Sequence, residues 1–350
     1  MKALEDLFCT VPVKQISNSD KIVIFSDLHL GNRKARDDFR HNSEMFMYAL
    51  LNYYNKNDYF LVLNGDIEEL QRVSFRKIYS KWRDLYQIFS LFNQNGRLLK
   101  TIGNHDIKLR KMKLPEKYPL LYDGIKFVYQ DNDILVFHGH QVSSYRDFRN
   151  TLIEILLKTA LHPLGIKNFT RSLDNSKKHK IEQCVYDFSV NKKIISIIGH
   201  THRPLFESLS DGEMLKFSIE RLISEYINTA DEEIRKSLQS QINFLKKKLD
   251  ETENPEYPAI NSTLYNTKLT IPCIFNSGYA IGNRGFTGIE IENGEISLIH
   301  WFGEKSGSKF FNYSSDKENL VFRNKTRIYN RTVLKKDTLN STFTRIRLLG

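Results

Sequence analysis

The sequence predicts an α/β fold, in which a layered β-sheet core is flanked by helices. The chain carries five aliphatic runs of the kind that form strands buried on both faces, at residues 21–25, 59–63, 98–102, 133–137 and 194–198. Helical patterns lie between some of these runs, and a cluster of polar residues follows each one. Strand and helix in alternation indicate an α/β sheet, and open sheets of this class carry their sites at the carboxyl ends of the strands.

Helices and a hairpin are predicted from residue spacing. One apolar helix face repeats at three- and four-residue intervals between the second and third runs, and a weaker pattern of Phe39, Phe46, Leu50 and Tyr53 precedes the second run. The first of these faces comprises Ile78, Trp82, Leu85, Phe89 and Phe92. Residues 288–299 alternate between apolar and polar around Asn293 and Gly294, which predicts a β-hairpin closed by a type I′ turn.

Two segments interrupt this scheme. The first begins with the apolar stretch 151–157, and the second places apolar residues at helical spacing from Ile223 to Leu249. We therefore divide the chain into a catalytic domain, a helical cap insertion, a helical, hairpin-like insertion and a basic C-terminal extension. These are residues 1–207 with 271–302, residues 143–192, residues 208–270 and residues 303–350.

Composition excludes several classes of protein. The chain has 350 residues, is 40% hydrophobic and 27% charged, and so is neither a disulfide-stapled miniprotein nor a disordered chain. It has no apolar run that is long enough to span a bilayer, and its start does not resemble a secretory signal. Its three distant cysteines favour a reducing cytoplasm over a disulfide framework.

Positive charge is concentrated in the C-terminal extension. Residues 303–350 contain eleven basic and four acidic residues, and so carry +7 of the total net charge of +11. Such a segment suits a nucleic acid or an anionic membrane surface as partner, the latter implying peripheral membrane association. Because it is separate in sequence from the polar clusters, we expect truncation at Gly303 to leave the hydrolysis of small substrates intact.

The polar clusters contain oxygen and imidazole ligands without thiolates. Asp27, His29, Asp66, Asn104, His105, Asp106, His138, His200 and His202 all follow strand-like runs. This donor mixture suits Mn²⁺, Fe or Zn²⁺ in a hydrolytic site. In an extended segment, residues i and i+2 face the same side, so the two side chains of an Asp-x-His or His-x-His pair can bind one ion. So many ligands indicate two ions about 3.5–4 Å apart, with Asp66 as the bridging carboxylate.

The order of these blocks resembles the calcineurin-like metallophosphoesterases. The matching motifs are Asp27-x-His29, Gly65-Asp66, Gly103-Asn104-His105-Asp106, His138-Gly139-His140 and Gly199-His200-Thr201-His202-Arg203-Pro204. The resemblance covers about residues 20–204 and implies a four-layer αββα sandwich with a dinuclear centre at its rim, here with helical insertions. It implies that Asp27, His29, Asp66 and His202 bind one ion, and that Asp66, Asn104, His138 and His200 bind the other. Mn²⁺ is the expected ion, with Fe, Zn, Ni and Co as alternatives.

The resemblance therefore implies that the protein is a metal-dependent phosphoester hydrolase. A hydroxide bridging the two ions would attack phosphorus in line, His105 would protonate the leaving oxygen, and Asp106 would orient the His105 ring. His140, Arg33, Arg203 and Arg284 are candidates for substrate contact.

The substrate is left open between several classes. The Asp-x-His-Leu-Gly block and the apolar insertion resemble the UDP-2,3-diacylglucosamine pyrophosphatases, which implies a nucleotide-sugar or lipid-linked diphosphate. His105 stands where that branch has Arg, and the same blocks occur in nucleases, for which the basic extension suits a polyanion. Protein phosphatase activity is a third alternative. A non-enzymatic one is an assembly scaffold, with oligomers formed through the helix at residues 223–249.

Overall fold

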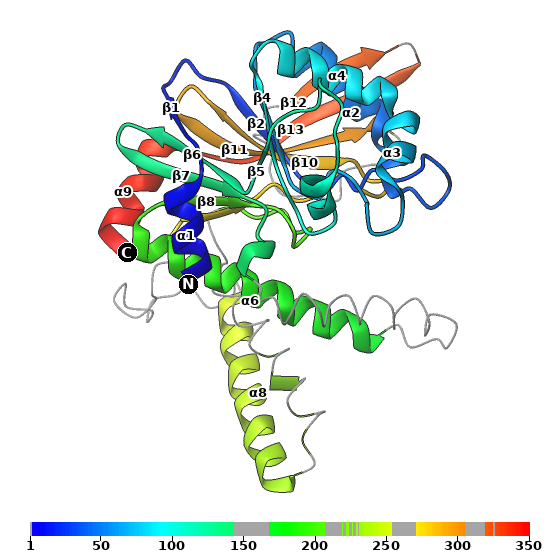
Figure 1. Ribbon diagram of the computed structural model, residues 1–350. Helices are drawn as coiled ribbons and strands as arrows, with labels where there is room; N and C mark the ends of the chain where they lie inside the picture. The colour runs from blue at the N-terminus through cyan, green and yellow to red at the C-terminus, as the bar shows by residue number, and fades with distance from the viewer. Residues whose placement is uncertain are drawn as a thin grey trace.

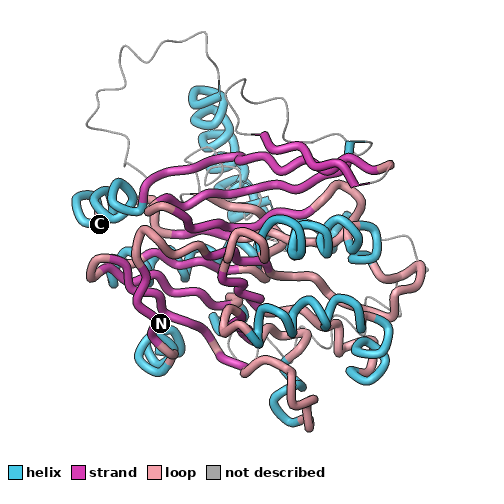
Figure 2. The backbone as a smooth tube through the Cα atoms, turned by 90° about the horizontal axis from the view of Figure 1, so that it is seen from above, coloured by secondary structure: helices cyan, strands magenta, loops and turns pink. Residues whose placement is uncertain are grey.

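The computed structural model describes residues 2–142, 168–206, 231–253, 271–304, 319–324 and 326–350, with single positions at 219, 222, 223, 226 and 229. In this described part, the strands form one sheet of eight strands and one of five (Figure 1). Seen from above, helices lie outside the layered strands (Figure 2).

The larger sheet has the order β12-β13-β11-β10-β2-β3-β4-β5. The pairs β2–β3, β3–β4 and β4–β5 are parallel. The pairs β2–β10, β10–β11, β11–β13 and β13–β12 are antiparallel. Its strands are β2 (Ile22–Phe25), β3 (Phe60–Asn64), β4 (Leu98–Thr101), β5 (Leu121–Tyr122), β10 (Phe286–Glu292), β11 (Glu295–Gly303), β12 (Asn319–Asn324) and β13 (Arg327–Thr338).

The smaller sheet has the order β1-β6-β7-β8-β9. The pair β6–β7 is antiparallel and the other neighbours are parallel. Its strands are β1 (Val13–Ile16), β6 (Gly124–Tyr129), β7 (Asn132–Phe137), β8 (Ile195–Ile198) and β9 (Ile274–Asn276). All five predicted runs are therefore strands, three of them in the larger sheet and two in the smaller.

Alternation along the buried strands creates four layers. In β2, Val23 and Phe25 belong to the core beneath α2 to α4, whereas Ile22 and Ile24 pack between the two sheets. On the far side, Phe137 and Ile198 contact the core beneath α1 and α6. Successive side chains of a strand point to opposite faces, so each central strand supports two cores at once. This arrangement confirms the predicted αββα sandwich.

Helices α2 to α4 cover one outer face of the sandwich, and α1 and α6 cover the other (Figure 1). The helices of the described part are α1 (Lys2–Thr10), α2 (Ser43–Ala49), which continues as a π-helical turn (Leu50–Tyr54), α3 (Phe75–Lys81), α4 (Arg83–Gln94), α6 (Asn168–Lys192), α8 (Glu232–Glu253) and α9 (Leu339–Leu349), with short 3-10 helices at Asp38–His41, Ile107–Lys111 and His140–Val142. The pattern from Ile78 to Phe92 predicted one helix, but it forms two. Trp82 leaves helical geometry between them (φ −109°, ψ 28°), and its indole N–H donates to the Gly31 carbonyl at 3.2 Å.

The predicted hairpin is confirmed. β10 and β11 pair in antiparallel register from Phe286–Trp301 to Glu292–Glu295. Asn293 and Gly294 between them have positive φ angles of 54° and 73°, as a type I′ turn requires.

The C-terminal segment continues the larger sheet beyond residue 303. β13 pairs along β11, and α9 buries Leu339, Phe343 and Ile346 in the core between the sheets. The sequence predicted that a separate basic extension begins at residue 303. In the structure, the described part of this extension belongs to the sandwich. The expectation that truncation at Gly303 leaves hydrolysis intact is therefore corrected, because such a truncation removes two strands and part of the core.

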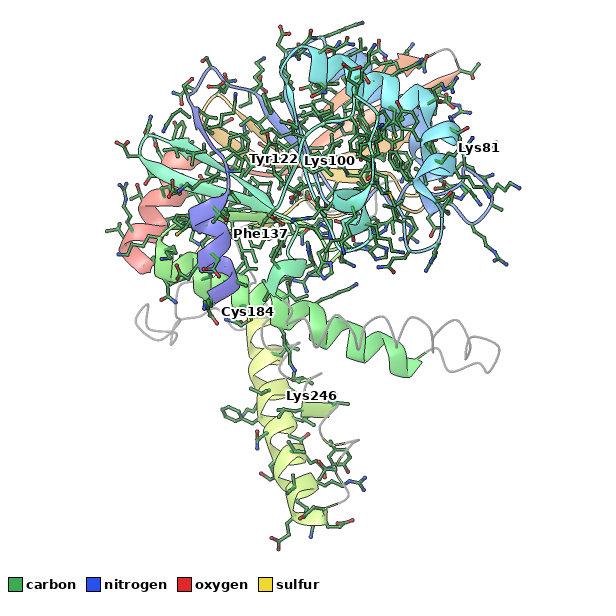
Figure 3. The ribbon with its side chains drawn as sticks, in the orientation of Figure 1. Lys81, Lys100, Tyr122, Phe137, Cys184 and Lys246 are labelled. Atoms are coloured by element: carbon green, nitrogen blue, oxygen red, sulfur yellow. The ribbon has the colours of Figure 1, made fainter. Side chains whose placement is uncertain are left out.

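The two predicted insertions are described only in part. α6 forms the end of the first insertion, while the apolar residues 151–157 lie outside the described residues. α8 belongs to the second insertion, begins where Asp231 accepts from the backbone N–H of Glu233 at 2.9 Å, and projects from the layered body (Figures 1 and 3). Whether it is one arm of a hairpin also depends on residues outside the described part. No helix among the described residues has the length and apolar character needed to cross a bilayer.

Candidate metal centre

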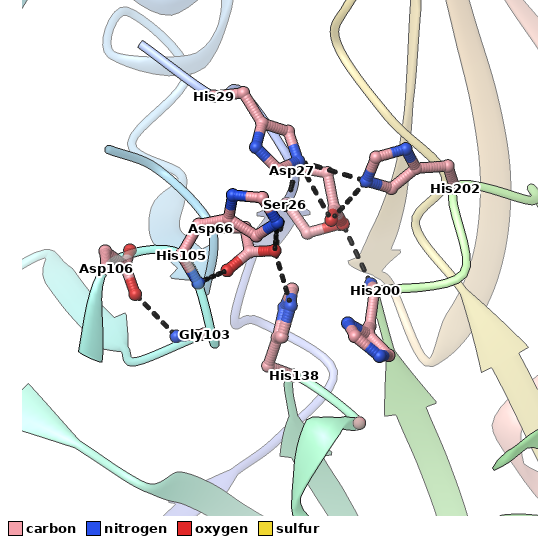
Figure 4. A network of polar contacts seen from close by, with 12 residues as sticks. Ser26, Asp27, His29, Asp66, Gly103, His105, Asp106, His138, His200 and His202 are labelled. Atoms are coloured by element: carbon pink, nitrogen blue, oxygen red, sulfur yellow. Dashed lines mark hydrogen bonds and ion pairs between the residues drawn. The ribbon is translucent and has the colours of Figure 1, made fainter. Parts of the chain in front are cut away.

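The predicted ligands converge at the carboxyl ends of five strands. Loops after β2, β3, β4, β7 and β8 bring them to one edge of the sandwich, where the two sheets meet (Figure 4). This convergence follows from the parallel strands, whose carboxyl ends share one edge.

The first ligand cluster consists of Asp27, His29 and His202. The Nε2 atom of His202 lies 3.0 Å from Asp27 Oδ1 and 3.0 Å from the Nε2 atom of His29. Three possible ligand atoms of this cluster lie within 4.8 Å of one another. Atoms this close together can bind one ion.

The second ligand cluster consists of Asp66, His138 and His200. Its ligand atoms also lie within 4.8 Å of one another, and His138 Nε2 is 3.1 Å from Asp66 Oδ2. The same Asp66 oxygen is 3.9 Å from the Nε2 atom of His29 in the first cluster. Asp66 thus lies between the clusters, where a bridging carboxylate is needed.

The donor set fits divalent ions. Asn104 follows β4 in the same group of loops, and its Oδ1 atom is buried without a hydrogen-bond partner in the described part of the chain. A buried amide oxygen without a donor costs free energy unless a ligand engages it. Together with imidazole nitrogens and carboxylate oxygens, it suits Mn²⁺ and other first-row ions.

The backbone at the ligands is left-handed rather than extended. Five predicted ligands have positive φ: Asp27 (55°), His29 (49°), Asp66 (52°), His200 (65°) and His202 (53°). The expectation that an extended segment aligns each i, i+2 pair is therefore wrong in its geometry, although both side chains of each pair do face the site. Residues other than glycine adopt this conformation at a cost, and such strain is concentrated at functional sites.

Two glycines let the loops approach closely. A Cβ atom on Gly103 would lie 2.1 Å from Asp66 Oδ1, and one on Gly199 would lie 2.6 Å from Asp27 Oδ2. Any side chain at either position would displace a predicted ligand.

Burial and neighbouring charges shift the pKa values of three predicted histidine ligands in opposite directions. Burial lowers the pKa of His29, but hydrogen bonding to Asp27 and other carboxylates raises it to about 10. The pKa of His138 rises to about 9, because the charges of Asp66 and Asp27 outweigh its burial. Burial and the charge of His138 lower the pKa of His200 to about 3. At neutral pH, metal binding must therefore displace protons from His29 and His138, while His200 is already neutral.

His105 is oriented by a residue that the sequence analysis missed. Its Nδ1 atom lies 2.9 Å from Glu69 Oε1, and the other Glu69 oxygen lies 3.3 Å from Nδ1 of His29. Burial raises the pKa of Glu69, but hydrogen bonds from His105 and His29 lower it to about 2, so its carboxylate is ionised. The signal was a carboxylate three residues after Asp66, just beyond the Gly65-Asp66 block.

The prediction that Asp106 orients the His105 ring is wrong. The Asp106 carboxylate accepts from the backbone N–H groups of Gly103 at 2.6 Å and Ile67 at 2.9 Å. It therefore clamps the loops after β3 and β4 together. Lys100 reaches the same carboxylate at 3.2 Å.

Lys100 and Glu68 complete a buried cluster beneath the loops. Lys100 Nζ lies 2.9 Å from Glu68 Oε2, and the side chains of Lys100, Glu68 and Asp106 are at most 1% exposed. Two hydroxyls donate to the other Glu68 oxygen, that of Tyr86 at 2.7 Å and that of Tyr118 at 2.6 Å. Burial lowers the pKa of Lys100, but the adjacent carboxylates raise it above its ordinary value, so the ammonium stays charged.

Two of the residues predicted to contact substrate, Arg33 and Arg203, interact with carboxylates of the protein itself. The guanidinium of Arg33 lies 2.8 Å from Asp84 and 4.5 Å from the ring centroid of Trp82. That of Arg203 lies 3.9 Å from the buried carboxylate of Glu182 in α6.

The other two candidates differ from each other in exposure. His140 follows β7, and burial together with the charge of His138 lowers its pKa to about 3. Arg284 is exposed and lines a pocket next to Tyr279.

Comparison with known proteins identifies the family. A family model described as calcineurin-like phosphoesterase matches residues 20–204, more than half of the chain. No curated protein matches it in sequence. Among solved structures, the chain is similar to a conserved uncharacterized protein, a predicted phosphoesterase, of Streptococcus pneumoniae TIGR4, at 11% identity over 81% of this chain and 89% of that chain, with a TM-score of 0.29. It is also similar to a single mutant of Vps29 from Entamoeba histolytica, at 10% identity over 82% of this chain and 94% of that chain, with a TM-score of 0.33. By its family model, the chain belongs to the calcineurin-like phosphoesterases.

Proposed function

We propose that this protein is a phosphoester hydrolase that depends on two divalent ions, with Mn²⁺ as the ion of choice. The observation that carries the proposal is the pair of ligand clusters, of which the second contains Asp66 and the first has His29 Nε2 3.9 Å from an oxygen of Asp66. The first ion would be held by Asp27, His29, Asp66 and His202, and the second by Asp66, Asn104, His138 and His200. Bound ions of this kind neutralise phosphate oxygens and lower the pKa of water.

His105 supplies the proton for the leaving oxygen. Its Nδ1 atom is held by Glu69, so the opposite atom, Nε2, is directed toward the site, 3.9 Å from Asp66 Oδ2. The ionised Glu69 keeps the proton on Nδ1 and fixes the tautomer and the angle of the ring. In the imidazolium form Nε2 carries a second proton, and passing that proton to the leaving oxygen returns the ring to the neutral Nδ1–H tautomer, which is the role of a general acid.

The substrate class that we favour is a nucleotide-linked diphosphate. The Asp-x-His-Leu-Gly block and the insertion between His138 and His200 support it through their resemblance to diphosphate-cleaving relatives. A metal-replete assay would compare an aryl phosphomonoester, an aryl phosphodiester, a UDP-linked acyl sugar and single-stranded DNA. Preference for the acyl sugar supports the proposal, whereas comparable cleavage of DNA would replace it with a nuclease.

The role of His105 is tested with leaving groups of different quality. We expect His105→Ala to retain metal, measured by elemental analysis, and to lose about 10²–10⁴-fold in turnover of an ester with a poor leaving group. A good aryl leaving group needs less protonation, so its loss should be much smaller. The control is His41→Ala, at an exposed histidine before α2. Equal losses for both leaving groups would remove His105 from this role.

A further inference from the structure

A small pocket lies beside the first ligand cluster. It is lined by Pro204, two residues beyond His202, and by Tyr279, whose ring centroid is 6.4 Å from that of His202. The pocket encloses about 100 Å³. One water needs about 10–15 Å³ of this kind of volume, so the space is large enough for several waters or for one group the size of a phosphate.

The loop that forms the pocket is held in one conformation. The buried Asn42 donates from Nδ2 to the carbonyls of Ala280 at 2.8 Å and Gly285 at 3.0 Å. The His300 ring donates from Nε2 to the Arg284 carbonyl at 3.0 Å. The backbone N–H of Ala280 also donates to the carbonyl of Asp27 at 3.3 Å, which fastens the loop to a predicted metal ligand.

Gly285 fixes the turn next to Arg284. It has a positive φ of 94°, and a Cβ atom there would lie 2.0 Å from the Trp301 carbonyl oxygen. The backbone that carries Arg284 is therefore defined on both sides before any ligand binds. Such preorganisation is what a binding site requires.

Arg284 carries a charge that the described part of the chain does not neutralise. Its side chain is exposed, and no described carboxylate lies within ion-pair distance of it. Arg33 and Arg203, the other two arginines predicted to contact substrate, each contact a carboxylate. An arginine on a rigid loop presents a planar set of donors that matches the oxygens of a phosphate.

We propose that Arg284, with the hydroxyl of Tyr279, binds the second phosphate of a diphosphate substrate, the one that is not attacked. This inference rests on the proposed function. The oxygen of water forms a bond to the attacked phosphorus while the bridging P–O bond breaks. The electron pair of that bond stays on the bridging oxygen, which leaves with the second phosphate and takes its proton from His105. Arg284 then stabilises the charge that develops on the leaving phosphate.

The test compares a diphosphate with a single phosphate. For Arg284→Ala, we expect kcat/KM for a UDP-linked sugar to fall about 10- to 100-fold relative to kcat/KM for a bis-aryl phosphodiester. Arg284→Lys should recover part of this loss, because it keeps the charge but not the paired donors. The matched control is Arg347→Ala, which removes the same charge from an exposed position on α9. An unchanged ratio between the two substrates would overturn the subsite.

A binding measurement separates this inference from the proposed function. Calorimetry would measure the affinity of the UDP-linked sugar for metal-loaded His105→Ala protein, with and without Arg284→Ala. A loss of about tenfold or more supports the subsite even if no turnover is found, and equal affinities overturn it. Absence of metal-dependent hydrolysis by the natural protein, in contrast, would overturn the proposed function.

Discussion

Replacing Lys100 with Met tests the buried cluster beneath the metal centre. Met keeps the length of the side chain but leaves the carboxylates of Glu68 and Asp106 without the ammonium that lies 2.9 Å and 3.2 Å away. Removing one partner of a buried ion pair costs about 3–5 kcal/mol, because the remaining charge stays buried. Glu68 keeps two tyrosine hydroxyls and Asp106 keeps two backbone amides, so we expect about 3 kcal/mol, at the lower end of that range.

The free energy of unfolding can be followed by urea titration with tryptophan fluorescence, because Trp82 and Trp301 are both fully buried. The control is Lys126→Met, whose partly exposed ammonium lies 3.7 Å from Asp133 and 4.2 Å from the centroid of the Phe8 ring, and which should contribute about 1 kcal/mol. Adding Glu68→Gln to Lys100→Met removes one unpaired charge and should recover part of the loss.

The same substitution should weaken metal binding. Asp106 clamps the loops that carry Asp66 and Asn104, and outer partners of this kind affect metal affinity by about 10- to 100-fold. Calorimetric titration with Mn²⁺ measures this change. If Lys100→Met costs no more than Lys126→Met in stability and leaves metal affinity unchanged, the reasoning about the cluster is refuted.

Two further predictions concern the C-terminal segment and the histidines. Among the described residues, truncation after residue 303 removes five buried apolar side chains, worth about 10 kcal/mol at 1.5–3 kcal/mol each, so we expect an unfolded product by circular dichroism; a folded, active truncation would contradict this. These side chains are Tyr329, Val333, Leu339, Phe343 and Ile346. The raised pKa values of His29, about 10, and His138, about 9, mean that both are protonated at pH 7 in the metal-free protein. Metal binding should release protons, and the apparent affinity should rise with pH from 7 toward 9; heats of binding that are independent of the ionisation enthalpy of the buffer would count against this.

The fold could be predicted because its central strands are buried on both faces. Apolar runs such as Phe60–Asn64 and Ile195–Ile198 are stable only inside a sheet that is covered on both faces, and the polar residues after them mark the ends of the strands. The break at Trp82 could not be predicted in the same way. Its apolar spacing continues through both helices, and the hydrogen bond to the Gly31 carbonyl that accompanies the break joins residues 51 positions apart.

The C-terminal segment shows why a count of charges can mislead. The count assigns Arg331 to a basic extension, yet its guanidinium donates to the Glu290 carboxylate in β10 at 3.0 Å, and both side chains are buried. Formal charge holds no information about pairing, and the partner lies 41 residues away on another strand. Because β13 carries such pairs into the larger sheet, its charge does not by itself indicate a polyanion partner.

The identities of the ligands could be predicted, but their geometry depends on contacts between loops. Asp27 and His29 reach the site through left-handed backbone, which costs about 1–2 kcal/mol for each residue. The loop after β3 offsets this cost, because Gly65 and Asp66 accept hydrogen bonds from the backbone N–H groups of Asp27 at 3.1 Å and His29 at 3.0 Å. The first ligand cluster can therefore form only when both loops are docked. Since Asp66 belongs to the second of these loops, each ligand cluster depends on the folding of the other, and we infer that the two ions bind to a site that the sandwich has assembled rather than to separate local motifs.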